Sequence, residues 1–392
     1  MTRLAPTPSP AMTQWPTLGV YAALPTVGLV AGPSYAALIF GLGFIQLLAV
    51  ICIERRIPVA DPALALLAVA FAVVSWATVA WAIQPAHSRG AALQVTVIFA
   101  GVLVFLAATP LPDAKAIDRL FLVLAAATVL GAAIIAIDWC IGEKFQSLVM
   151  QRPPHGVETK YNRGIDYLVL IAWPQLAFAV WQRRWRRVGV LTAALAVVLG
   201  VGVSLAAQAA ALVGLIVLAL AIWLPRIAAW LLAAGMAVLA LGTPLGLRLL
   251  TTHRAELAAY LKYSGFERLE IWDPLTADVL ERPLLGWGIG DAEAIPHAYL
   301  QHGHSVYPHN QWLELWVETG AIGAAIALAL ALLTLRRISR LAPPIQPYAL
   351  AAFASAILIS CVNFEVTTDS WWAALAAGAW LFTALDHHIR AH

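Results

Sequence analysis

The stretch Pro308-His-Asn-Gln-Trp-Leu-Glu-Leu-Trp-Val-Glu-Thr-Gly-Ala-Ile-Gly-Ala-Ala-Ile-Ala-Leu-Ala-Leu-Ala-Leu-Leu-Thr-Leu335 joins a polar start to an apolar run that is long enough to cross a membrane. Because proline suits the first turn of a helix, we expect one helix that runs to about Leu335, with His309 and Asn310 on its first turn. A helix N-terminus attracts anions and keeps a nearby imidazole neutral. This setting favours a histidine that acts as a general base beside a phosphate-bearing substrate.

The composition excludes an ordinary soluble domain. Of the 392 residues, 61% are hydrophobic and only 11% are charged, whereas roughly a quarter of the residues of a soluble domain are charged. With a mean hydropathy of +0.81, we expect an all-α, polytopic integral membrane protein that forms a single membrane domain over residues 1–392. The three cysteines show no metal or redox spacing, and nothing favours nucleic-acid binding.

Apolar runs of about 17 to 25 residues predict about twelve transmembrane helices. They are expected near residues 16–31, 34–53, 60–84, 91–108, 119–142, 164–182, 188–204, 207–224, 227–247, 310–335, 346–363 and 370–386. Basic residues of the short loops between them fall on one side, as at Arg55, Arg183 and Arg336, and this marks that side as cytoplasmic. Both termini are then cytoplasmic, and residues 1–16 form a short tail.

Two longer polar segments, residues 143–163 and 248–308, are predicted on the opposite, external side, and both carry positive charge. Long loops are translocated whatever their charge, which is one explanation; an anionic, lipid-linked substrate is the other. The longer segment contains a helical pattern from Phe266 to Glu281, bent by Pro274, which we expect to lie on the membrane like a lid. The glycine-rich stretch Pro283–Gly290 predicts a tight corner, and it lacks the lysine of a phosphate-binding loop.

Three external side chains are candidates for one common cavity. His309 heads the tenth span, and Arg268 lies on the interfacial helix. Arg163 heads the sixth span, where Asn162 or the polar loop before it is expected to hold it near the interface. Two guanidinium groups beside a helix N-terminus match a diphosphate, because arginine binds phosphate oxygens bidentately and keeps its charge. Each arginine alone could equally extend to lipid head groups. Together with His309 they favour a diphosphate site.

Polar residues further along the helix extend this predicted site. Asn310 and Glu314 are four residues apart and share a helix face, which Glu318 continues by another turn. We expect Glu314 to orient a substrate hydroxyl or an arginine, and Glu318 to pair with another buried polar group. Gly320 and Gly323 favour close helix packing.

Carboxylates near the external ends of other spans are further candidates. Asp369 is predicted to cap the last span and to contribute to the cavity rim. Asp138 and Asp166 lie near the external ends of the fifth and sixth spans, where they are candidates to line the same cavity. Neither a metal nor a cofactor is expected, because the histidines of the long external segment are loosely spaced. These are His297, His302 and His304.

Taken together, these motifs resemble the O-antigen ligase and polymerase superfamily of polytopic glycosyltransferases. The resemblance is carried by Pro308–Gly323, by Arg268–Trp272 with Pro283–Gly288, and by Asn162–Gly164. It covers residues 160–330, and the remaining spans by their number alone. Relatives often have a Ser-Arg pair where the eighth span begins, but this chain has Gln208 near that position, so no site role is assigned there.

The resemblance implies a GT-C-like, metal-independent, inverting transferase that works on the periplasmic face of the bacterial inner membrane. Its donor would be a polysaccharide linked to undecaprenyl diphosphate, and its acceptor a sugar hydroxyl of the lipid A-core, which completes lipopolysaccharide. His309 would activate that hydroxyl or assist its approach, while Arg163 and Arg268 would hold the diphosphate. Further substrate contacts are expected from Asn162, Asn310, Glu314 and Asp369.

Four other functions remain open. An O-antigen polymerase or a protein O-oligosaccharyltransferase would share the donor and differ in the acceptor; the single long external segment and the lack of a large soluble domain favour the ligase. A flippase or transporter of lipid-linked sugars would have charged residues at mid-membrane and broken helices in matching halves. Here the polar residues gather at one face, which argues against transport. A non-catalytic assembly subunit would leave the histidine segment unexplained.

Overall fold

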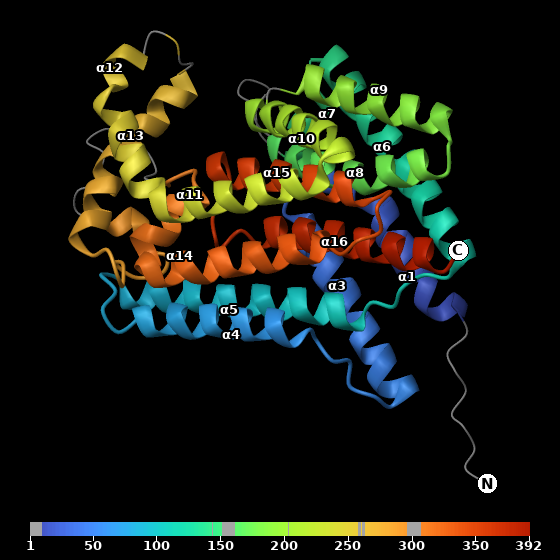
Figure 1. Ribbon diagram of the computed structural model, residues 1–392, viewed down its shortest axis with the longest axis horizontal. Coiled ribbons are helices and arrows are strands. Elements are labelled where there is room, and N and C mark those ends of the chain that lie inside the picture. Colours follow the sequence, from blue (N-terminus) through green and yellow to red (C-terminus); the bar gives the residue numbers. More distant parts are fainter. Residues whose placement is uncertain are drawn as a thin grey trace.

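The computed structural model describes residues 10–142, 144–150, 161–202, 204–257, 260, 263–295 and 307–392, which form helices and turns without a strand. The elements are α1 (Pro10–Ala23), α2 (Val27–Val30), α3 (Ser34–Ala49), the π-helical η1 (Val50–Glu54), α4 (Pro62–Thr78), α5 (Pro85–Ala108), α6 (Ala114–Cys140), α7 (Lys144–Met150), α8 (Asn162–Trp181), α9 (Trp185–Val201), α10 (Leu205–Trp223), α11 (Pro225–Thr252), α12 (Arg254–Leu257), α13 (Tyr263–Glu281), the 3-10 helix η3 (Ala292–Ala294), α14 (Gln311–Ile338), α15 (Gln346–Val362) and α16 (Asp369–Arg390). The helices α12 and α13 gather at one end of the bundle, whereas α1 and the C-terminal end of α16 lie toward the other (Figure 1).

Several of these helices are suited to a membrane. Within the described residues, seven are long and apolar enough to cross one: Ser34–Glu54, Pro85–Ala108, Ala114–Cys140, Asn162–Trp181, Leu205–Trp223, Pro225–Thr252 and Gln311–Ile338. The shorter helices α4 and α15 are also apolar, and they pack against α14. The prediction of an all-helical, polytopic, membrane-embedded protein is confirmed, and the number of twelve spans stays a prediction.

The first predicted span, residues 16–31, is wrong as a continuous helix. α1 ends at Ala23 and α2 begins only at Val27, with Pro25 between them. Proline has no N–H group to continue the helical hydrogen bonds, so the chain turns here. The turn is packed against α6, because a Cβ atom at Gly131 would come within 2.2 Å of the Pro25 carbonyl oxygen. The N-terminal region is therefore folded onto the bundle.

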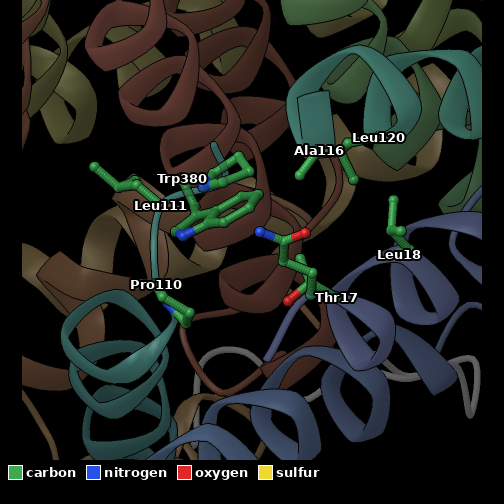
Figure 2. Close-up of a pocket in the computed structure, with 9 residues that line it drawn as sticks. Thr17, Leu18, Pro110, Leu111, Ala116, Leu120 and Trp380 are labelled. Carbon is green, nitrogen blue, oxygen red and sulfur yellow. The ribbon is translucent and has the colours of Figure 1, made fainter. Parts of the chain in front are cut away.

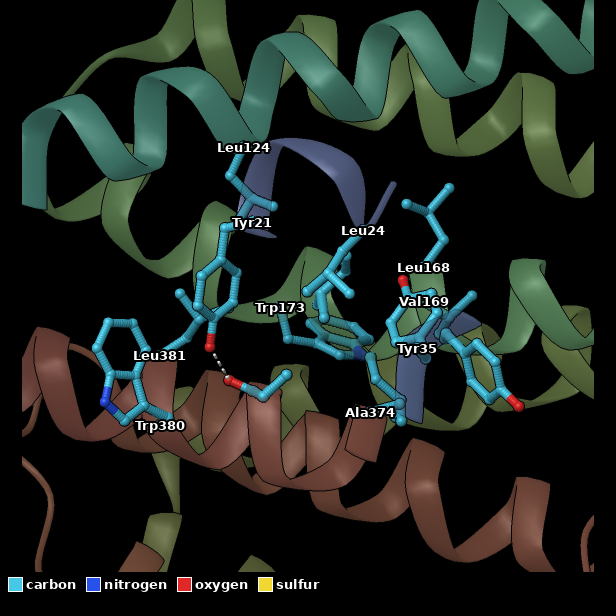
Figure 3. Close-up of a cluster of buried hydrophobic side chains, with 14 of the residues drawn as sticks. Tyr21, Leu24, Tyr35, Leu124, Leu168, Val169, Trp173, Ala374, Trp380 and Leu381 are labelled. Carbon is cyan, nitrogen blue, oxygen red and sulfur yellow. Dashed lines mark hydrogen bonds between the residues drawn. The ribbon is translucent and has the colours of Figure 1, made fainter. Parts of the chain in front are cut away.

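The largest apolar core surrounds α8. Most residues of α8 are buried, and its aromatic side chains pack against neighbouring helices, as Tyr167 does against Tyr35 with ring centroids 4.5 Å apart. Close by, the Tyr21 hydroxyl donates a hydrogen bond of 3.1 Å to the carbonyl oxygen of Ala377 in α16 (Figure 3). This packing of α1, α3, α6 and α16 around α8 fixes the N-terminal end of α8, where Arg163 lies.

A small pocket lies between α1, the connection from α5 to α6, and α16 (Figure 2). Pro110, Leu111 and Trp380 form much of its wall, and the Trp380 indole N–H donates to the Thr109 carbonyl oxygen at 3.2 Å. Apolar side chains dominate this wall. The pocket is therefore a small gap in the apolar packing between these elements.

The helix α14 is broken at Gly320, which has φ +63° and ψ −160°. The break leaves the carbonyl oxygens of Val317 and Glu318 without their helical donors. They accept instead from the backbone N–H groups of Trp287 (2.8 Å) and Gly288 (3.0 Å). The predicted glycine-rich corner therefore supplies the backbone N–H groups that the broken helix lacks at this point.

Only glycine fits at this junction. A Cβ atom at Gly320 would lie 2.4 Å from the carbonyl carbon of Leu284, and one at Gly286 would lie 2.4 Å from the carbonyl carbon of Glu318. Both glycines also have positive φ angles, which other residues rarely adopt. Gly320 thus permits close packing against the corner rather than against another helix.

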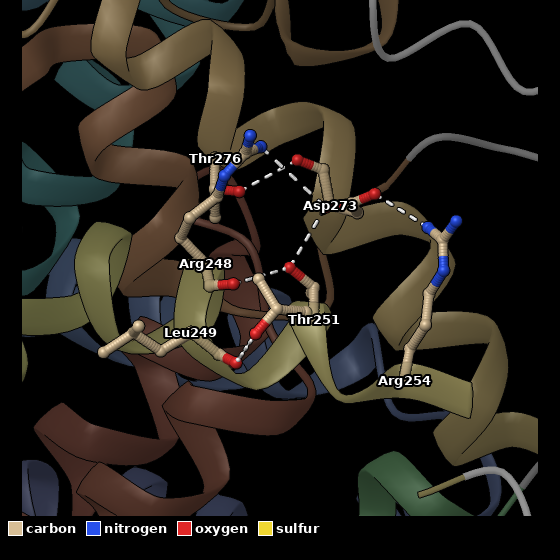
Figure 4. A network of polar contacts seen from close by, with 7 residues as sticks. Arg248, Leu249, Thr251, Arg254, Asp273 and Thr276 are labelled. Carbon is tan, nitrogen blue, oxygen red and sulfur yellow. Dashed lines mark hydrogen bonds and ion pairs between the residues drawn. The ribbon is translucent and has the colours of Figure 1, made fainter. Parts of the chain in front are cut away.

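The helix α13 extends from Tyr263 to Glu281, and the prediction of a helix containing Pro274 is confirmed. Its side chains Leu269 and Leu275 are buried in one cluster with Leu313 of α14, so α13 covers the beginning of that helix. A polar network ties it to α11 and α12: Asp273 accepts from the Thr251 hydroxyl (3.0 Å) and pairs with Arg254 (2.7 Å) and Arg248 (3.8 Å) (Figure 4). Its position on a membrane surface stays a prediction.

Candidate active site

The histidine of the quoted stretch lies just before α14, which begins later than predicted, at Gln311. Asn310 is the N-cap, and its Oδ1 accepts from the backbone N–H groups of Trp312 (3.0 Å) and Leu313 (3.1 Å). An asparagine side chain satisfies the first free N–H groups of a helix, which explains why the helix starts after it. The placement of His309 and Asn310 on the first turn is thus wrong. His309 precedes the cap with a positive φ of 50°.

The backbone around His309 is held from two sides. The carbonyl oxygen of Pro308 accepts from the Trp272 indole N–H of α13 at 2.7 Å. The Tyr307 hydroxyl donates to the carbonyl oxygen of Asn363, after α15, at 2.8 Å. The Tyr307 ring meets the imidazole at an interplanar angle of 61°, with centroids 4.3 Å apart. The histidine therefore sits between α13 and the connection from α15 to α16.

The surroundings of His309 keep its imidazole neutral. Burial lowers the pKa of His309 to about 4, and the positive charges of Arg268 and Arg163 act in the same direction. At neutral pH the ring is therefore unprotonated and can accept a proton. Its Nδ1 atom is buried and has no hydrogen-bond partner among the described residues.

Arg268 reaches this site from α13. It is half-buried, its Nε has no hydrogen-bond partner in the described part of the chain, and no described carboxylate forms an ion pair with it. Burial lowers the pKa of Arg268, but a guanidinium group stays charged at neutral pH. Arg268 thus keeps a partly desolvated positive charge close enough to His309 to lower the pKa of the imidazole.

Arg163 reaches the site from the start of α8. It follows Asn162, the first residue of the helix, and is exposed. Its Cβ lies 3.3 Å from where a Cβ atom at Gly32 would be, so the turn before α3 packs tightly against it. The buried Oδ1 of Asn162 has no hydrogen-bond partner among the described residues, and so it does not hold Arg163 through that atom.

The two glutamates of α14 are buried and bonded to backbone groups. Glu314 accepts from the N–H of Val366 at 2.9 Å, which ties the connection from α15 to α16 onto α14. Glu318 accepts from the N–H groups of Gly290 and Ala292, so its predicted polar partner is the end of the glycine-rich corner. Glu314 keeps its predicted substrate role only as a hypothesis. In the structure it anchors the connection that borders the site.

That connection supplies an acidic residue which the sequence analysis did not single out. Glu365 is half-buried, and burial raises the pKa of its carboxyl group, while the Arg163 charge opposes this shift. Its Oε2 accepts from the Thr367 hydroxyl at 3.0 Å. In the sequence, Glu365 stands in the short polar turn that also contains Asp369, two predicted spans after His309. This position was the feature that could have marked it as a site residue.

Two predicted carboxylates make contacts within the fold. Asp369 is not the cap of α16, because Thr368 occupies the N-cap position and Asp369 is the first helical residue, accepting from the N–H of Ser370 at 2.6 Å. Asp138 accepts from the Tyr161 hydroxyl at 2.6 Å, so this oxygen is used within the fold.

The histidines proposed to be too loosely spaced for a metal lie outside the described residues, in the part of the segment between α13 and α14 that spans residues 296–306. They are His297, His302 and His304. Among the residues that the structure does describe, no group of three or more His, Cys, Asp or Glu side chains is placed to hold a metal ion.

A cavity of about 700 Å³ opens between α4, α5, α14, α15 and α16, and its walls are mainly apolar. One end reaches Gln311 and Val366, beside the histidine segment, and the other end reaches Arg337 and Asp61. Gln311 and Arg337 stand at opposite ends of α14. The cavity therefore runs along most of the bundle and ends next to the polar site.

This geometry defines a class of protein. It is a helical, membrane-embedded protein with a neutral histidine and two arginines at one end of its bundle. Among the buried atoms without a hydrogen-bond partner in the described residues are the Nε of Arg268, which can donate to an anion, and the Nδ1 of His309 and Oδ1 of Asn162, which can accept from a hydroxyl group.

Comparison with known sequences supports the predicted resemblance. Residues 204–328, which include Arg268 and His309, match the model of the O-antigen ligase family, so the resemblance is confirmed over this part of the chain. A protein of Rickettsia conorii that is named as a polysaccharide ligase is 27% identical over 132 residues, 31% of each chain. One of Rickettsia bellii is 25% identical over 240 residues, 56% of each chain. The chain thus spans 31% to 56% of the length of these curated relatives.

Proposed function

We propose that the protein is an O-antigen ligase, which transfers a polysaccharide from undecaprenyl diphosphate to a sugar hydroxyl of the lipid A-core at the periplasmic face of the inner membrane. The observation that carries this proposal is the neutral His309, placed within electrostatic reach of Arg268 and Arg163. The match of residues 204–328 to the O-antigen ligase family supports it independently.

The proposed reaction is a single displacement at the anomeric carbon of the donor sugar. The acceptor hydroxyl oxygen forms the new glycosidic bond, and the bond from that carbon to the diphosphate oxygen breaks. The hydroxyl proton passes to His309, and the electron pair leaves with the diphosphate. Arg268 and Arg163 offset the negative charge that develops on the leaving group. Attack opposite the leaving group inverts the configuration, and a diphosphate bound by arginines departs without a metal ion.

The low pKa of His309 fits this sequence of events. A base with a pKa near 4 accepts protons weakly at neutral pH. Two positive charges contribute to that low value, and a bound diphosphate would offset both of them. We therefore expect donor binding to raise the pKa of His309 and to make it a stronger base when the substrate is present.

The apolar cavity supports a lipid-linked donor. A polyprenyl chain within it would stay out of water while its diphosphate reaches the arginines, because the cavity ends at Gln311 beside the site. Arg336 and Arg337 lie at the opposite end of α14. Basic residues are enriched on the cytoplasmic side of membrane proteins, which supports a site at the periplasmic face and cytoplasmic termini.

The break in α14 bears on the transporter alternative. Broken helices in transporters line a substrate path, with their free backbone groups turned toward the cavity. Here the carbonyl oxygens of Val317 and Glu318 are occupied by Trp287 and Gly288 of the same chain. The break therefore holds the external corner in place, and the enzyme remains the better supported function.

The test is transfer by the purified protein with one labelled donor and several acceptors. We expect the polysaccharide to appear on the lipid A-core, with and without a chelator, and the matched variant Arg254→Gln to retain this activity. Elongation of a second donor molecule would instead assign a polymerase, and modification of a protein acceptor would assign an oligosaccharyltransferase. Movement of the donor across proteoliposomes without any new bond would assign a transporter.

A further inference from the structure

A chain of hydrogen bonds leads from the core of α8 to the histidine segment. Asp166 is fully buried, and its Oδ1 accepts from the Ser204 hydroxyl at 3.0 Å. Its Oδ2 accepts from the side-chain amide of Asn363. The backbone carbonyl oxygen of the same asparagine accepts from the Tyr307 hydroxyl at 2.8 Å. The Asp166 carboxylate is thus linked to Tyr307, two positions before His309, through Asn363 alone.

The last contact of this chain acts on the imidazole itself. The Tyr307 ring lies 4.3 Å from the His309 ring, centroid to centroid, at an angle of 61°. Such edge-to-face contacts favour one relative orientation of two rings. The Nδ1 of His309 has no hydrogen-bond partner among the described residues, so within this part of the chain no hydrogen bond to that atom sets the ring orientation.

The same carboxylate also belongs to the helix that carries Arg163. Asp166 and Arg163 are three residues apart on α8 and lie on the same side of it, and the Arg163 charge acts on the carboxylate. A shift of Asn363 would therefore change the position of His309 relative to Arg163. The two groups that meet the substrate in the proposed function come from elements that this carboxylate connects.

We propose that Asp166, acting through Asn363 and Tyr307, positions the imidazole of His309 relative to Arg163. This inference rests on the proposed function. Asp166 is a positioning residue and does not touch the substrate, since it is fully buried. An aspartate suits the role because a carboxylate only accepts, and both Ser204 and Asn363 donate to it.

Two conservative variants break the chain at different points. Tyr307→Phe keeps the ring beside His309 and removes only the hydroxyl. Asp166→Asn keeps the size of the side chain but replaces an acceptor by an amide that also donates. The matched control is Tyr167→Phe, which removes the buried hydroxyl of a tyrosine on α8. This hydroxyl is hydrogen-bonded to the Ser370 hydroxyl at 2.8 Å and is not part of the chain from Asp166 to Tyr307.

The experiment measures kcat and the KM for the donor, with active protein counted by donor binding. We expect Tyr307→Phe and Asp166→Asn each to lower kcat by about tenfold with little change in KM, because a misplaced base slows the chemical step. In the double variant we expect no further loss, since both changes break the same chain. Independent, multiplicative losses, or an equal loss in Tyr167→Phe, would overturn the proposal.

A second readout separates this inference from the proposed function. If the wild type transfers no sugar, the proposed function fails, and the imidazole can still be followed by NMR with labelled histidine, its signal assigned from His309→Ala. We expect Tyr307→Phe and Asp166→Asn to shift this signal and to raise the pKa of His309 from about 4, because burial is the largest cause of the low value. An unchanged signal in both variants would refute the positioning role.

Discussion

Two pairs of arginines lie near the end of the bundle that α13 covers, and they differ in their partners. Arg248 and Arg254 both pair with Asp273, at 3.8 and 2.7 Å, and so join α11, α12 and α13. Arg163 and Arg268 form no ion pair with any residue that the structure describes, and both lower the pKa of the same histidine. The first pair completes the fold. The second pair leaves positive charge uncompensated where a ligand could reach it.

The difference shows how to separate structural from functional charge at a membrane border. A partly buried cation without a counter-ion costs free energy that the fold alone does not recover. An anionic substrate recovers that cost on binding. Both sets of charges include a residue of α13: Asp273 belongs to the ion-pair network, and Arg268 belongs to the candidate site. This one helix therefore connects the network with the candidate site.

The largest effect is expected when the proposed base is removed. His309→Ala should lower kcat by about 10²–10⁴-fold, the range found for general bases, while donor binding changes little because both arginines remain. The measurement is steady-state transfer with the purified variant, after donor binding has shown that it is folded. Transfer at a near wild-type rate would mean that His309 is not the base.

The next effect is expected at the unpaired arginine of α13. Arg268→Ala should lower kcat/KM by about 100-fold and Arg268→Lys by about tenfold, because lysine keeps the charge but not the bidentate geometry. Kinetics with varied donor concentration will separate binding from chemistry. If Arg268→Lys and Arg268→Ala were equally active, geometry would not matter at this position, and a diphosphate contact would be excluded.

Sequence alone predicted much of the helical fold, since apolar length is a local property. The division at Pro25 and the break at Gly320 were missed for different reasons. Proline was visible but stood within an apolar run. The break depends on backbone donors from Trp287 and Gly288, more than 25 residues away, and no local pattern indicates such hydrogen bonds.

The candidate site was predicted in a similarly uneven way. His309 and Arg268 stood out because ionisable residues at a membrane border are costly. Tyr307 and Glu365 did not, because their importance comes from tertiary contacts. The partner of the Tyr307 hydroxyl is Asn363, 56 residues further along the chain. Residue type thus indicated the chemistry, whereas the residues that position it required the structure.

A smaller effect concerns pH. The pKa of free His309 is about 4, below its ordinary value, so the imidazole takes up a proton only as the pH falls through about 4. We expect the acid limb of kcat/KM, which reports the free enzyme, to lie near this pH. A bound diphosphate should raise that pKa, so the acid limb of kcat should lie at a higher pH.

The control for this pH prediction is Arg268→Gln. Removing its positive charge should raise the pKa of free His309, because that charge is one cause of the low value, and the acid limb of kcat/KM should move up accordingly. Identical acid limbs for kcat and kcat/KM in the wild type would contradict the coupling between the diphosphate and the histidine.

The smallest effect is expected at the paired arginines. Arg254→Gln breaks the ion pair with Asp273, in which both side chains are partly exposed, so it should cost about 0–1 kcal/mol in free energy of unfolding. Salt should reduce this difference, because exposed charges are screened, and transfer should stay close to the wild-type rate. Thermal unfolding at two salt concentrations, together with the transfer assay, measures both. If Arg254→Gln abolished transfer as completely as Arg268→Ala, the separation of structural from functional arginines would be wrong, and α12 and α13 would have to act as one unit over the site.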